Sequence, residues 1–117
     1  MEAHAISNGY MTGKVYIIWE IPHDDISGYE IDRNGVTIAS SLTEDEEGKA
    51  KFVSPTMFDH DHHTNLFKKD STKQLMFVDE NVYPYQHYEY QIIAKRINDI
   101  GEVMEQIESD FIYVQAQ

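Results

Sequence analysis

Residues 14–22, Lys-Val-Tyr-Ile-Ile-Trp-Glu-Ile-Pro, form the stretch that decides the fold. Side chains along a β-strand point alternately to opposite faces, and β-branched and aromatic residues favour strands. One face of such a strand carries only large apolar side chains: Val15, Ile17, Trp19 and Ile21. Pro22 ends the strand, because proline cannot donate a hydrogen bond to a central ladder. The stretch therefore predicts a strand over residues 14–21 with Trp19 in the core.

The same alternation recurs further along the chain, in segments separated by turn signals. Strands are expected over residues 28–33, 36–39, 75–78, 88–96 and 103–114, the last interrupted near 108–109. Asn34-Gly35, between the first two, is the strongest short hairpin signal, since both central residues of a type I′ turn need a positive φ. No helical periodicity of useful length appears. Several short strands with turns between them predict an all-β sandwich with Trp19 between its sheets.

The order of these segments resembles that of a bacterial-type fibronectin type III domain. Residues 15–22 and 26–31, the latter reading Ile-Ser-Gly-Tyr-Glu-Ile, are similar to the B and C strands of that family. Residues 33–39 resemble its C–C′ hairpin. Residues 77–94 resemble its E strand, E–F corner and F strand. Gly101 and residues 109–114 resemble its F–G loop and G strand.

This resemblance implies an immunoglobulin-like β-sandwich of fibronectin type III topology. It covers roughly residues 13–41 and 75–115, and strand A is best placed at residues 4–7. Tyr88 then occupies the family's tyrosine corner, with its hydroxyl bonded back to the E–F corner backbone. The expected structural core is Trp19, Tyr29, Tyr88, Tyr90 and Ile92.

The connection from C′ to E departs from the family pattern, because it runs from residue 43 to residue 74. Its periodicity is weak, and a structureless segment of this length is unusual inside a compact domain. It is too apolar for a bare linker: Phe52, Val53, Phe58, Leu66 and Phe67. We expect an elaborated connection whose aromatic residues dock on the sandwich, while residues 44–48 and 60–63 face solvent.

Composition narrows the class of protein. The chain has 117 residues, which fit one domain over 1–117, and 9 Lys+Arg against 21 Asp+Glu give a net charge of −12. That charge argues against nucleic acid and anionic membranes as partners. There is no Cys, no apolar run long enough to span a membrane, and no signal peptide at the N-terminus, so a cytoplasmic location is the default expectation.

Chemical motifs are few. No phosphate loop, nucleophile elbow or triad spacing appears, so we expect no enzymatic activity and no cofactor. The run Asp59, His60, Asp61, His62 and His63 has the side chains that bind zinc, nickel or copper, and its other interpretation is a solvated loop tip. His23-Asp24-Asp25 offers carboxylates to calcium but lacks a calcium-loop pattern, and an ordinary turn is the simpler interpretation.

The favoured function is a non-enzymatic binding or structural module that recognises a protein or a glycan. Its expected partner surface consists of aromatic residues: Tyr83, Tyr85, Phe58 and Phe67. The acidic run 44–47 is either a solvated loop or a contact for a basic partner. Two alternatives stay open. One is a structural subunit of a larger assembly, such as a phage or secretion particle; the other is a small metal-binding protein using His60 to His63. The sequence does not determine the oligomeric state.

Overall fold

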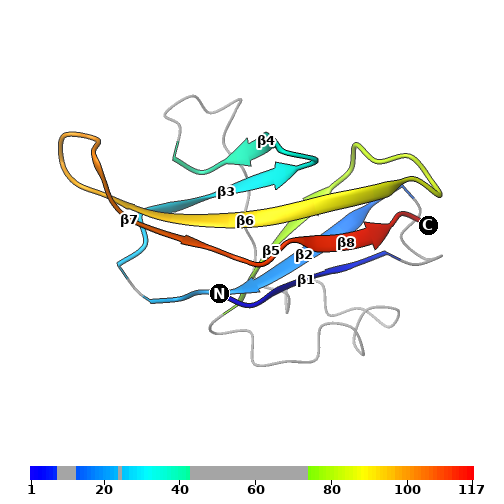
Figure 1. Cartoon of the computed structure of the whole chain (residues 1–117), viewed down its shortest axis with the longest axis horizontal. Helices are drawn as coiled ribbons and strands as arrows, with labels where there is room; N and C mark the ends of the chain where they lie inside the picture. The colour runs from blue at the N-terminus through cyan, green and yellow to red at the C-terminus, as the bar shows by residue number, and fades with distance from the viewer. Residues whose placement is uncertain (8–12, 24, 43–73) are drawn as a thin grey trace.

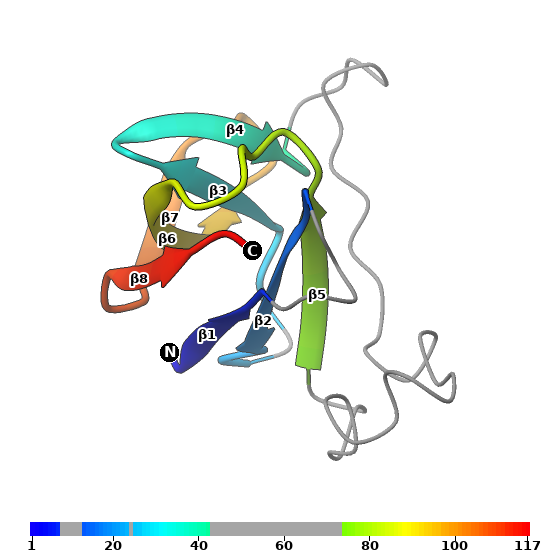
Figure 2. The same ribbon diagram turned by 90° about the vertical axis from the view of Figure 1, so that its right-hand side faces the viewer.

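The computed structural model describes residues 1–7, 13–23, 25–42 and 74–117, and within them the chain forms two antiparallel β-sheets. The three-stranded sheet has the order β1 (Ala3–Ile6), β2 (Val15–Glu20) and β5 (Gln74–Asp79). The five-stranded sheet has the order β4 (Val36–Ser40), β3 (Gly28–Arg33), β6 (His87–Ile97) and β7 (Val103–Glu108), and β8 (Ile112–Gln115) also pairs with β6. Figures 1 and 2 show the two sheets on opposite sides of the core.

The predicted all-β class with two packed antiparallel sheets is therefore confirmed. No helix occurs among the described residues, and hence none there that is long and apolar enough to cross a membrane. The strand predicted over 14–21 corresponds to β2, and the one over 88–96 corresponds to β6, the longest strand at 11 residues. The hairpin at Asn34-Gly35 joins β3 to β4, with φ of 52° and 82° at the two residues.

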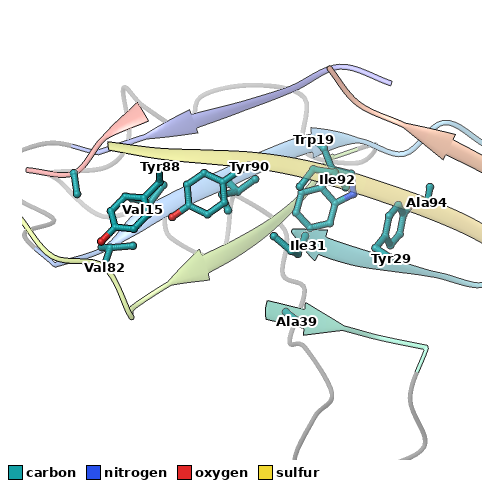
Figure 3. Close-up of a cluster of buried hydrophobic side chains, with 12 residues drawn as sticks. Val15, Trp19, Tyr29, Ile31, Ala39, Val82, Tyr88, Tyr90, Ile92 and Ala94 are labelled. Carbon is teal, nitrogen blue, oxygen red and sulfur yellow. The ribbon is translucent and has the colours of Figure 1, made fainter. Parts of the chain in front are cut away.

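The core lies between the sheets and is built from the inward faces of β2, β3 and β6. Trp19 is only 1% exposed, and its ring centroid lies 5.4 Å from that of Tyr29. Figure 3 shows Tyr88 and Tyr90 side by side along the same core. The buried cluster includes every residue predicted as structural core: Trp19, Tyr29, Tyr88, Tyr90 and Ile92. Alternation along each strand places these side chains on one face of the pleat.

The other face of the three-stranded sheet is also apolar. Tyr16, Ile18 and Met76 form a second buried cluster there, and Ile18 lies directly opposite Met76 in the β2–β5 register. Because β2 buries side chains on both faces, its five residues Val15 to Trp19 are all buried.

The last strand expected, over 103–114, is divided into β7 and β8 by a bulge at Ser109. Ile93 pairs with Glu108, whereas Tyr90 pairs with Ile112, so the edge segment uses one more residue than β6 over this interval. The Ser109 N–H donates to the Ile92 carbonyl (2.9 Å), and the Ser109 hydroxyl accepts from the Ile92 N–H (2.9 Å). The serine side chain thus takes the place of a ladder carbonyl and keeps the buried backbone paired.

Candidate functional site

Exposed aromatic side chains gather along β8 and the residue before it. Tyr113 is 72% exposed and Phe111 is 54% exposed, while the intervening Ile112 and the following Val114 pack against the core. Tyr113 lies directly opposite Glu89 of β6. Since β6 turns Tyr88 and Tyr90 inward, Glu89 and Tyr113 share the outer face of the five-stranded sheet. Contiguous patches of such exposed side chains are typical of interaction sites.

Tyr85 is held beside the end of β8 by two hydrogen bonds. Its N–H donates to the carbonyl of Ala116 (2.7 Å), and the Gln115 side-chain amide donates to the Tyr85 carbonyl (3.2 Å). Tyr85 has a φ of 67°, a conformation that costs a non-glycine residue energy and that these two bonds help to hold. Tyr85 is also largely exposed. We call Tyr85, Phe111 and Tyr113 the β8 aromatic strip.

The outer face beneath the strip carries negative charge without matching cations. Asp32, Glu89 and Glu108 belong to it, because each pairs with an outward-facing position of a neighbouring strand. These partners are Gln91 of β6, Tyr113 of β8 and Ile93 of β6. Lys95 is the cation of this face, and it is already bound to Glu30 at 2.5 Å. Aromatic rings beside free carboxylates can bind a cation through both the ring face and an ion pair.

A second polar cluster lies between the sheets at the end of β5. Asp79 is 2% exposed and receives hydrogen bonds from the Arg33 guanidinium, the Tyr90 hydroxyl and the Asn81 N–H. Burial raises the pKa of Tyr90, and the hydrogen bond to Asp79 raises it further. Burial alone lowers the pKa of Arg33, but the contact with Asp79 outweighs it, so the pKa is raised. The cluster therefore contains an ion pair between Arg33 and Asp79.

This ion pair borders a pocket of about 350 Å³ at the side of the sandwich where β4 and β5 face each other. Arg33, Ile38, Phe77 and Asp79 are among its lining residues. Within the described part of the chain, the hydrogen bonds of the Arg33 guanidinium are made by Nη1, to Asp79 and the carbonyl of Asn81. Because the arginine and the aspartate satisfy each other, the cluster is a link between the sheets and not a reactive pair.

The residues predicted as functional fall into two groups. Tyr83 and Tyr85 are both exposed on the corner between β5 and β6. The remaining predicted residues lie outside the described residues: Phe58, Phe67, Asp59, His60, Asp61, His62 and His63. Among the residues that are described, no group of three or more His, Cys, Asp or Glu side chains could hold a metal ion.

The His23 turn has the ordinary geometry of a loop. Nδ1 of His23 accepts a hydrogen bond from the Asp25 N–H (3.2 Å), so the proton of the neutral ring lies on Nε2. Nε2 then donates to Glu105 of β7 (2.9 Å), which joins the β2–β3 loop to the five-stranded sheet.

Comparison with known proteins does not assign the chain to a family. No protein-family model, curated protein or solved structure matches it. The fold and the strip together define a two-sheet β-sandwich with an exposed aromatic surface on one edge of its larger sheet.

Proposed function

We propose that this protein is a non-enzymatic binding module of fibronectin type III topology, which recognises a protein partner through the β8 aromatic strip. The observation that carries the proposal is the alternation at β8. Phe111 and Tyr113 face solvent, whereas Ile112 and Val114 pack on the core. Two large rings held outward by a well-packed strand offer contact area at a low cost in conformational entropy.

The strand order supports the proposed topology. With β1, β2 and β5 as strands A, B and E, and with β4, β3, β6 and β7–β8 as C′, C, F and G, each sheet has the order that the resemblance implies. The Tyr83 N–H donates to the Tyr88 hydroxyl at 2.8 Å, five residues away, which is the contact expected of a tyrosine corner.

A protein partner is favoured over a glycan by the shape and chemistry of the strip. It runs along an edge strand on an open sheet face, where a flat protein surface can reach both rings. Phe111 adds apolar contact area without a polar group, which suits a protein interface. Aromatic residues are enriched at the centre of protein interfaces, because they combine a large contact area with a rigid side chain.

A comparison of three forms of the full chain tests the proposal. Affinity capture is run with the wild type, the double variant Phe111→Ser/Tyr113→Ser and the control Ile100→Ser. Ile100 is also strongly exposed, but it lies in the β6–β7 turn, at the opposite end of the molecule from the end of β8 (Figure 1). Circular dichroism and urea unfolding establish that all three are folded. Substitutions at such exposed positions are expected to change stability by about 0.5 kcal/mol or less.

We expect at least one protein to bind the wild type and Ile100→Ser and to be lost from the double variant. Its dissociation constant, measured with the purified partner, is expected to rise by more than tenfold in the double variant, since interface aromatics commonly contribute over 1 kcal/mol each. If the double variant retains every protein that the wild type captures, the strip is not the recognition surface. Binding of a glycan instead of a protein would contradict the proposed partner class.

A further inference from the structure

We infer that the partner of the β8 aromatic strip is basic: a Lys- or Arg-rich protein segment whose cations bind between the exposed rings and the carboxylates of the outer sheet face. The inference rests on the proposed function and adds the chemistry of the partner. Three features support it: the distribution of charge over the described residues, the position of Glu89 beside Tyr113, and the hydrogen bonds that hold Glu108.

Every Lys and Arg among the described residues is already paired with an acid. The pairs are Lys14–Glu80, Arg33–Asp79, Lys95–Glu30 and Arg96–Glu105. The same residues contain thirteen Asp and Glu against these four basic residues, which leaves a formal charge of −9. The described surface therefore has no free Lys or Arg to offer an acidic partner, and it has many carboxylates to offer a basic one.

Unlike Glu30, which is paired with Lys95, Asp32 and Glu108 of the outer face have only neutral partners among the described residues. The Thr37 hydroxyl donates to Asp32 (2.7 Å), and the side-chain amides of Gln91 (3.4 Å) and Gln106 (2.7 Å) donate to Glu108. These bonds fix the position of the carboxylates and leave their charge in place. An incoming ammonium or guanidinium group meets a carboxylate that is already oriented, which lowers the entropic cost of forming the ion pair.

Glu89 and Tyr113 together form the best place for a cation. They are directly opposite in the β6–β8 register and share the outer face, so their Cβ atoms are neighbours at about 5 Å. The Glu89 N–H and C=O groups bond to Asn34, and the Glu89 side chain forms no ion pair with any of the described residues. A Lys or Arg lying over the Tyr113 ring can therefore reach the Glu89 carboxylate at the same time.

The same charges argue against the other occupants of this face. A second copy of the chain would bring Asp32, Glu89 and Glu108 against like charges, which destabilises an interface. An acidic segment would meet the same repulsion. A neutral apolar segment would cover the carboxylates without pairing them, and buried unpaired charges are costly.

Titration of the ¹⁵N-labelled full chain with defined peptides tests the inference. The probe is an alternating lysine–valine octapeptide, and the matched controls are the serine–valine and glutamate–valine octapeptides. We expect amide shift changes for the lysine–valine peptide, centred on β6 and β8 and including Glu89 and Tyr113. Raising the salt concentration from about 50 to about 500 mM is expected to weaken binding strongly, since screening acts on exposed charges.

Variants that neutralise carboxylates test the role of charge in this binding. Glu89→Gln/Glu108→Gln is expected to lower the affinity for the lysine–valine peptide by roughly three- to tenfold and to flatten its salt dependence. Glu102→Gln is the matched control, an exposed acid in the turn between β6 and β7, and is expected to leave the affinity nearly unchanged. The dispersion of the amide spectrum reports directly whether each variant is folded.

Two results would overturn the inference: equal binding of the serine–valine peptide, or shift changes confined to another face. If no basic peptide binds but Phe111→Ser/Tyr113→Ser still abolishes capture of a cellular protein, the basic partner is wrong and the proposed function stands. If the double variant loses no captured protein either, both are wrong.

Discussion

Nη1 of Arg33 lies 3.0 and 2.9 Å from the two carboxylate oxygens of Asp79, so one nitrogen joins the two sheets. Arg33 belongs to β3 and Asp79 to β5. The Tyr90 hydroxyl donates to Oδ2 of Asp79 (2.7 Å), and the Asn81 N–H donates to Oδ1 (3.1 Å). Both oxygens of this carboxylate, which is only 2% exposed, therefore accept hydrogen bonds.

Removing the charge of Asp79 is expected to destabilise the fold strongly. Asp79→Asn leaves the Arg33 guanidinium partly buried without a counter-charge. We expect a loss of about 3 kcal/mol in the free energy of unfolding, the low end of the range for breaking a buried pair, because the Arg33 side chain remains 23% exposed. Urea unfolding followed by Trp19 fluorescence measures the change. Glu80→Gln is the control, since its contact with Lys14 is exposed and long at 3.8 Å, and it should shift the midpoint little.

The free energy of unfolding is expected to fall at alkaline pH because of the ionisation of Tyr90. Burial and then the contact with Asp79 raise the pKa of Tyr90 in the folded state, while in the unfolded chain it titrates near pH 10. Above about pH 10 the unfolded state loses a proton that the folded state keeps, so rising pH favours unfolding by up to about 1.4 kcal/mol per pH unit for this group. Urea midpoints measured from pH 8 to 11 should therefore decline, and Tyr90→Phe should decline less steeply. Parallel curves for the two proteins would contradict this origin.

The corner tyrosine is expected to stabilise the turn between β5 and β6. Tyr88→Phe removes the acceptor of the Tyr83 N–H and leaves that backbone group without its bond. We expect a loss of about 1–3 kcal/mol without a change of fold. Equal urea midpoints for the variant and the wild type would show that the bond contributes nothing.

Trp19 is expected to report the native core directly, because it is the only tryptophan in the chain. At 1% exposure its fluorescence maximum should lie well below that of free indole in water, and it should shift to the red on unfolding. Trp19→Ala is expected to cost about 3–5 kcal/mol, measured by circular dichroism because the variant lacks the fluorophore. A native maximum equal to that of free indole would place Trp19 outside the core.

The sequence could predict those parts of the fold that depend on local patterns. Alternation of apolar side chains located β2 and β6, and Asn34-Gly35 located the hairpin, because both signals lie within a few neighbouring residues. The contact between Arg33 and Asp79 was not predicted. The two residues are 46 positions apart, and no local pattern distinguishes either of them from the other charged residues of the chain.

Of the β8 aromatic strip, only Tyr85 was predicted from the sequence. Phe111 and Tyr113 were missed because of the bulge at Ser109. A single unbroken strand over residues 103–114 would place Phe111 and Tyr113 on the same face as Ile107, which packs on the core. The extra residue at Ser109 exchanges the two faces, so Ile112 and Val114 turn inward instead. The sequence predicted an interruption near residues 108–109 but not the exchange of faces, because Ser109 acts through Ile92 on another strand.

The bulge at Ser109 also bears on how the protein behaves at high concentration. β7 and β8 form one border of the larger sheet, and a long, regular border strand is a template on which a strand of another molecule can be added. The bulge divides this border into one run of six residues and another of four, with a local change of twist between them. The bulge therefore interrupts the regular border on which another strand could be added, and such interruptions are one of the ways in which natural sheets limit edge-to-edge pairing.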